Sequence, residues 1–180
     1  KASAELLVNS YVKTYDIDCV ITRCTNNYGP RQFYEKLIPK TIFLAFQKKK
    51  IPIYGKGQNI RDWIFVDDHC DAVYQVLLNG KTGESYNISA NNEINNITIV
   101  EKILEIMGES TDLIEFVEDR PGHDLRYSLD SSKIRNSLNW KNKANFNDGL
   151  EKTITWFQNN YNEKNIKNVI LKSTPWKSDI

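Results

Sequence analysis

Short runs rich in β-branched residues alternate along this chain with longer segments whose apolar residues recur every three or four positions. The run Cys-Val-Ile-Thr-Arg-Cys at 19–24 is typical of a buried strand. Before it, Leu7, Tyr11 and Tyr15 have the spacing of one helix face. The alternation continues to about residue 160 without an internal repeat or a low-complexity linker. Strands that alternate with helices favour an α/β architecture.

Turn residues and capping residues divide the chain into these elements. We expect Pro39 in the first turn of a helix, where its missing N–H is tolerated. Asp67 or Asp68 would cap a helix that stops at Gly80, and Thr98 with Glu101 forms a capping box. The predicted helices are 1–15, 37–49, 67–79, 98–108, 131–138 and 148–160; the strands are 19–24, 51–54 and 61–66 (a hairpin), 86–89 and 113–117; loops fall at 26–30 and 119–124.

The composition excludes several classes of protein. Hydrophobic residues make up 40% and charged residues 26% of the chain, as in ordinary globular proteins. The net charge of +1 gives no reason to expect nucleic acid or an anionic membrane as a partner. No apolar run is long enough to span a bilayer, and no signal peptide is apparent.

The chain gives no sign of a disulfide framework or a metal site. Cys19, Cys24 and Cys70 form no CxxC pair, so we predict reduced thiols in a cytoplasmic protein. His69 and His123 are not spaced with other ligands for a metal. No glycine-rich nucleotide fingerprint or P-loop occurs anywhere in the sequence.

Lysine is used far more often than arginine, so an arginine can indicate a place that needs a flat, bidentate donor. Arg61 and Arg120 both lie at turns, where they could hold a phosphate. Alternatively, each forms a surface ion pair with its neighbour, Asp62 or Asp119. The residues alone therefore indicate only part of an α/β ligand-binding enzyme.

Six segments, taken in order, carry a closer resemblance. They are Thr-Arg-Cys-Thr-Asn-Asn-Tyr-Gly-Pro-Arg-Gln-Phe-Tyr-Glu-Lys-Leu-Ile-Pro at 22–39, Pro-Ile-Tyr-Gly at 52–55, Gly-Gln-Asn-Ile-Arg-Asp-Trp at 57–63, Val-Asp-Asp-His-Cys at 66–70, Tyr-Asn-Ile at 86–88 and Asp-Arg-Pro-Gly-His-Asp-Leu-Arg-Tyr at 119–127. Together they resemble the dTDP-glucose 4,6-dehydratases of the extended short-chain dehydrogenase/reductase superfamily. The Arg-Asp-Trp and Asp-His-Cys pieces favour this family over its epimerase and decarboxylase relatives.

The resemblance covers residues 1 to about 160 and implies the carboxyl-terminal part of such an enzyme. It implies the end of an NAD-binding Rossmann-type domain at 1–30 and a smaller mixed α/β substrate-binding domain at 31–160. Within the latter, 62–90 would return to the Rossmann part, and 161–180 would form a tail.

The implied activity of the intact protein is NAD-dependent conversion of dTDP-glucose to dTDP-4-keto-6-deoxyglucose for polysaccharide synthesis. In this family NAD takes hydride from C4 of the sugar, an acid/base pair eliminates water across C5 and C6, and the hydride returns to C6. A homodimer is implied, with Tyr11 and Tyr15 either in its helical interface or in the core of one subunit.

Lys1 aligns with the lysine of the superfamily's Tyr-x-x-x-Lys pair. It would contact the cofactor, while the partner tyrosine and the Asp-Glu acid/base pair would precede this chain. No N-cap residue stands ahead of the first helix, so we expect that helix to begin upstream of Lys1.

The resemblance also implies the ligand contacts. Asn27 would lie at the nicotinamide end of NAD. The substrate would be held by Asn26 at the sugar or its phosphate, Lys36 and Leu37 along the diphosphate and base, Pro52 and Tyr54 at the thymine, Arg61 and Arg120 at the diphosphate, and Asn96 and His123 beside them.

Two alternatives remain at this point. The intact protein could be a UDP- or GDP-sugar dehydratase or an epimerase. This chain could instead serve as a nucleotide-binding or dimerising module without catalysis.

Overall fold

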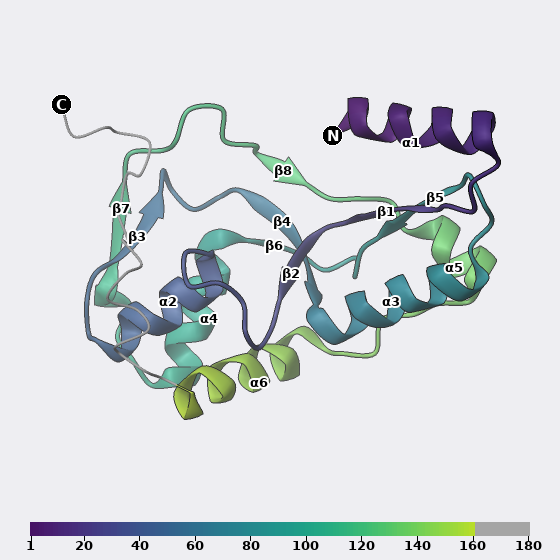
Figure 1. Ribbon diagram of the computed structural model, residues 1–180. Coiled ribbons are helices and arrows are strands. Elements are labelled where there is room, and N and C mark those ends of the chain that lie inside the picture. Colours follow the sequence, from purple (N-terminus) through teal and green to yellow (C-terminus); the bar gives the residue numbers. More distant parts are fainter. Residues whose placement is uncertain (161–180) are drawn as a thin grey trace.

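The computed structural model describes residues 1–160 (Figure 1), and the predicted tail at 161–180 lies outside the described residues. In chain order the elements are α1 (Ala2–Tyr15), β1 (Ile21–Cys24), β2 (Asn26–Tyr28), α2 (Leu37–Phe46), β3 (Ile51–Tyr54), β4 (Ile60–Phe65), α3 (Val66–Asn79), β5 (Ser85–Ile88), β6 (Glu93–Asn95), α4 (Asn96–Met107), the 3-10 turn η1 (Thr111–Leu113), β7 (Ile114–Val117), β8 (Arg126–Tyr127), α5 (Ser132–Leu138) and α6 (Phe146–Asn159). The mixed α/β class is confirmed.

All the predicted helices are present, although α2 ends at Phe46 rather than at residue 49 and α6 begins at Phe146 rather than at residue 148. Pro39 lies in the first turn of α2. Gly108 ends α4 in the left-handed conformation with φ 69°, as a glycine C-cap does. Gly80 ends α3 with an extended backbone instead.

Strand pairing is mostly parallel and joins segments far apart in the sequence. β1 pairs with β5, β2 with β4, and β3 with β7, all in parallel. β4 also pairs with β6 in the antiparallel sense and with β8 in parallel. The predicted hairpin of 51–54 with 61–66 is wrong, because β3 and β4 each take a different, distant partner.

Three other local predictions are wrong. Asn26 and Asn27 belong to β2 rather than a loop, because their backbone pairs with Trp63 and Ile64. The capping box at Thr98 does not form, since Asn95 caps α4 and accepts the N–H of Thr98.

The predicted caps at the start of α3 are also replaced. The Asp68 carboxylate accepts the backbone N–H groups of Lys143 and Ala144 at 2.9 and 3.0 Å. Asp68 therefore ties the chain ahead of α6 to α3 instead of capping its own helix.

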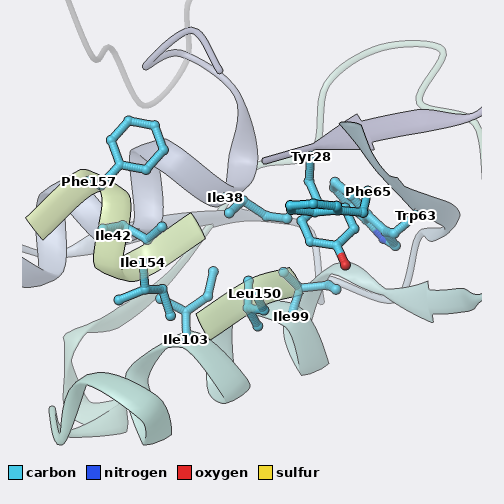
Figure 2. Packing of buried hydrophobic residues seen from close by; sticks show 10 residues of the cluster. All are labelled: Tyr28, Ile38, Ile42, Trp63, Phe65, Ile99, Ile103, Leu150, Ile154 and Phe157. Atoms are coloured by element: carbon cyan, nitrogen blue, oxygen red, sulfur yellow. The ribbon is translucent and has the colours of Figure 1, made fainter. Parts of the chain in front are cut away.

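The largest hydrophobic cluster lies between α2, α4 and α6 and the strands β2 and β4 (Figure 2). Trp63 and Phe65 point into this cluster, whereas Ile64 packs into a second cluster with α3 and β5. β4 is thus buried on both faces, as successive strand residues point to opposite sides. A third cluster holds Ile51 and Ile53 of β3 against α2 and α4.

Asp62 fixes β4 to the chain that follows β5. Its carboxylate is fully buried and accepts the backbone N–H groups of Ala90, Asn91 and Asn92 at 3.1–3.4 Å. The side chain is therefore a structural anchor and is not available to pair with Arg61.

In Figure 1, α1 and α3 lie on opposite sides of β1 and β5, while α2, α4 and α6 gather at the other end of the molecule. Across residues 1–160, no helix has the length and apolar character needed to cross a membrane.

Candidate functional site

A pocket of about 320 Å³ opens where α2, β3, β4 and the 119–124 loop meet. All nine residues that the resemblance implies for the substrate line it. These are Asn26, Lys36, Leu37, Pro52, Tyr54, Arg61, Asn96, Arg120 and His123. Residues from six separate segments of the chain are brought together here, which their sequence positions do not require.

Strand geometry places four of the lining side chains. Pro52 and Tyr54 alternate with the buried Ile51 and Ile53, so they lie on the face of β3 away from the core. Arg61 and Trp63 are two residues apart on β4 and share the face that reaches the pocket. Register then sets Asn26 directly beside Trp63.

Two helices begin at the pocket. α2 starts after Lys36 and α4 starts at Asn96, and Lys36, Leu37 and Asn96 line the wall. The first-turn N–H groups of a helix carry a partial positive charge, and this favours an anionic ligand. No side chain caps α2.

Arg61 is buried in the wall, with only 7% of its surface exposed. It donates from Nη1 to the carbonyl oxygen of Ile60 at 2.7 Å and from Nη2 to that of Asp124 at 2.9 Å. These neutral acceptors orient the guanidinium without neutralising it, and other N–H donors remain for a ligand. The predicted surface ion pair of Arg61 with Asp62 is therefore wrong.

Arg120 adds a second guanidinium to the same wall. Burial lowers the pKa of Arg61, and the charge of Arg120 lowers it further, while Asp124 opposes both effects. Burial raises the pKa of Tyr54, and Arg120 opposes that shift. Two like charges in one desolvated pocket favour an anion bound between them.

Arg120 and Asp119 interact, but not through the predicted ion pair of their side chains. The backbone N–H of Arg120, not its guanidinium, donates to Asp119 Oδ1 at 2.8 Å. The hydrogen bond between Asp119 and His123 is the main cause of the lowered pKa of Asp119. The charge of Arg120 makes a smaller contribution in the same direction.

His123 is held in the pocket wall by Asp119. Its Nδ1 atom lies 2.7 Å from Asp119 Oδ1, and only 6% of its side chain is exposed. The ring stands edge-on to Tyr54, with 6.2 Å between centroids and 80° between planes. Because Nδ1 is engaged by the carboxylate, Nε2 is the nitrogen left for a ligand.

The two residues expected at the cofactor, Lys1 and Asn27, lie outside this pocket. Lys1 is exposed at the start of α1. The amide nitrogen of Asn27 faces the carbonyl oxygen of Thr25 and the sulfur of Cys24, and its buried Oδ1 has no hydrogen-bond partner among the described residues. An orphaned acceptor fits a polar donor such as a carboxamide N–H, so Asn27 is compatible with the cofactor role.

Five further residues line the pocket that the sequence did not identify. They are Gln32, Glu35, Lys40, Ile53 and Trp63. For two of them a signal was present: Lys40 stands one helical turn after Lys36, and Trp63 stands two strand positions after Arg61. Within residues 1–160, no group of three or more His, Cys, Asp or Glu side chains is arranged to hold a metal ion.

A family model described as GDP-mannose 4,6 dehydratase matches residues 1–153. The dTDP-glucose 4,6-dehydratase of Neisseria gonorrhoeae is 46% identical over 171 residues, covering 89% of this chain and 49% of that protein. The dTDP-glucose 4,6-dehydratase 1 of Escherichia coli K12 is 45% identical over 167 residues, covering 89% of this chain and 46% of that protein. The chain therefore spans about half the length of the curated relatives it matches.

Solved structures agree with this relationship. The dTDP-glucose 4,6-dehydratase of Bacillus anthracis in complex with NAD has a TM-score of 0.85 and 46% identity, covering 89% of this chain and 51% of that one. The dTDP-glucose 4,6-dehydratase of Streptomyces venezuelae, with NAD and TYD bound, has a TM-score of 0.86 and 41% identity, covering 89% of this chain and 50% of that one. A UDP-glucuronic acid 4-epimerase from Bacillus cereus has a TM-score of 0.84 and 28% identity, covering 89% of this chain and 52% of that one.

Proposed function

Because this chain belongs to the GDP-mannose 4,6 dehydratase family, we propose that the intact protein catalyses NAD-dependent dehydration of dTDP-glucose to dTDP-4-keto-6-deoxyglucose. This chain would contribute mainly the nucleotide-sugar-binding part. One observation carries the proposal: nine residues expected at the substrate, drawn from six segments, line a single pocket. Relatives named for this activity at about 45% identity support it over the GDP-sugar alternative.

The chemistry of the pocket suits a nucleoside diphosphate sugar. Tyr54 offers an aromatic face to a base, and Pro52 lies on the same side of β3. Arg61 and Arg120 supply planar, multiply donating cations for the diphosphate. Asn26 and Asn96 offer amides that both donate and accept, as hydroxyl groups require.

NAD, when bound, would accept a hydride from the sugar and later return it. Lys1 and Asn27 are the residues of this chain proposed to contact it. The orphaned Oδ1 of Asn27 supports this assignment, because its amide nitrogen is already engaged by Thr25 and Cys24. The catalytic tyrosine and the acid/base pair would come from the remainder of the intact protein.

We also propose the division of the chain expected above. Residues 1–30 and 62–90 would complete the cofactor domain, a division supported by the parallel pairing of Ile21–Cys24 with Ser85–Ile88. The rest of 31–160 would form the substrate-binding part, which includes α2, β3, α4 and β7 around the pocket.

A homodimer and a cytoplasmic location complete the proposal. α1 has no buried residue and exposes Leu7, Tyr11 and Tyr15 by 51–65% of their surface. Such an apolar face is typical of an interface. The three cysteines are free thiols, which suits a reducing compartment.

The test is an assay of the intact protein with dTDP-glucose and NAD. We expect formation of the 4-keto chromophore, and the Arg61→Met variant should need a higher substrate concentration for the same rate. Melting shifts with dTDP, UDP and GDP then compare the nucleotides. A larger shift with UDP or GDP, or no keto product, would reject the assignment, whereas binding of dTDP without turnover would support the non-catalytic module.

A further inference from the structure

Lys40 is a pocket residue to which neither the motifs nor the resemblance assigned a role. Its backbone N–H donates to the carbonyl oxygen of Lys36 at 2.9 Å, which closes the first turn of α2. Residues 36, 37 and 40 therefore share one helix face, and all three line the pocket. We infer that Lys40 is a third cationic ligand of the nucleotide's diphosphate, beside Arg61 and Arg120; this inference rests on the proposed function.

The charge of the pocket wall supports this role. Four of the described residues that line it are basic: Lys36, Lys40, Arg61 and Arg120. Among the described residues of that lining, Glu35 is the one acid, and its carboxylate is paired with Lys36 at 2.8 Å. Basic side chains therefore outnumber acidic ones among the described residues of the pocket wall, and such a surplus favours a polyanionic ligand.

Lys40 differs from Lys36 in how it is held. The ion-paired side chains of Lys36 and Glu35 are 58% and 56% exposed, so their interaction with each other contributes little. Lys40 is half-buried, and burial lowers the pKa of its ammonium group. A desolvated cation gains more from an incoming phosphate than a hydrated one, because the local dielectric is lower and less water must be displaced.

Trp63 and Leu37 form apolar surface on the same wall. Lysine can lay its methylene stem along such surface while its ammonium group reaches the polar centre of a site. The position therefore suits a long cation, which would act beside the rigid fork that Arg61 supplies from β4.

The experiment compares thymidine, dTMP and dTDP as ligands of the intact protein, by calorimetry, for wild type and Lys40→Met. We expect the variant to bind dTDP about tenfold more weakly, as loss of a charge-assisted contact predicts, and thymidine with unchanged affinity. The difference between the two proteins should shrink as salt is raised. Lys40→Arg should retain most of the affinity for dTDP.

Lys49→Met is the matched control, because it removes the same charge from an exposed lysine just beyond the end of α2. It should leave all three affinities unchanged. An equal loss for thymidine and dTDP in Lys40→Met, or no loss for either, overturns the role of Lys40. If the wild-type protein itself binds no dTDP, the proposed function fails instead, and the two failures are distinguishable.

Discussion

Nδ1 of His123 lies 2.7 Å from Oδ1 of Asp119, so an exposed carboxylate orients a ring that is almost fully enclosed in the pocket wall. The same carboxylate group accepts the N–H of Arg120. Asp119 thus acts on the pocket through two of its lining residues and does not line it itself.

Replacing Asp119 with alanine should weaken nucleotide binding without unfolding the protein. The ring of His123 would lose the partner that fixes its orientation, which corresponds to about a three- to tenfold loss of dTDP affinity. Calorimetric titration measures the effect. Glu115→Ala, an exposed carboxylate on the neighbouring β7, is the control and should bind dTDP normally. Equal behaviour of the two variants would contradict the positioning role.

Gly55→Ala should disturb the contact between Asp119 and His123, because Gly55 lies against the Asp119 carboxylate. Gly55 has φ 56°, and a β-carbon there would lie 3.0 Å from Oδ2 of Asp119. Gly108 has φ 69°, but a β-carbon added there would meet no atom within 4 Å, so Gly108→Ala isolates the backbone strain.

Both glycine variants should lose about 1 kcal/mol of folding free energy, because alanine is disfavoured in the left-handed region. Gly55→Ala alone should also weaken dTDP binding. Urea denaturation and titration measure the two effects separately. Unchanged affinity in Gly55→Ala would show that Asp119 moves aside without consequence for the pocket.

Asp62→Ala should be among the most destabilising substitutions in the chain. It leaves the buried N–H groups of Ala90, Asn91 and Asn92 without their acceptor, at a cost of about 2–4 kcal/mol. Asp71→Ala removes a carboxylate that pairs with Lys143 at 3.6 Å nearer the surface, and should cost less than about 1 kcal/mol. Chemical denaturation of both variants checks the contrast, which fails if the two losses are similar.

Tyr28 should make the protein less stable in alkali. Burial raises the pKa of its phenol, and the charges of Asp68 and Asp148 add to the shift. A raised pKa means that the contribution to stability is complete below the unfolded value of about 10 and is lost as pH rises toward the folded value.

Tyr28→Phe should flatten the loss of unfolding free energy between about pH 9 and 11. At neutral pH it should cost about 1 kcal/mol, because the hydroxyl donates to the carbonyl oxygen of Phe146 at 3.2 Å. Tyr74→Phe, on the exposed face of α3, should keep the wild-type slope. Urea denaturation over this pH range measures the dependence of the unfolding free energy on pH. If Tyr28→Phe leaves that dependence unchanged, Tyr28 is not the group that destabilises the protein in alkali.

The sequence by itself determined the class of fold, the presence of the helices and nine of the described residues that line the pocket. Helical spacing and end signals such as Pro39 and Gly108 act within a few residues, so they can be recognised without knowing the rest of the structure. The resemblance supplied those nine residues, which come from separate segments of the chain.

Only the tertiary structure decided which strands pair and what each polar group contacts. β3 lies beside β7 rather than the nearby β4, because strand partners are chosen by packing across the whole chain. Arg61 and Asp62 are neighbours on β4, so their side chains point to opposite faces: the arginine toward the pocket, the aspartate toward three backbone amides. Adjacent charges in a sequence suggest an ion pair, and the pleat of the strand prevents it.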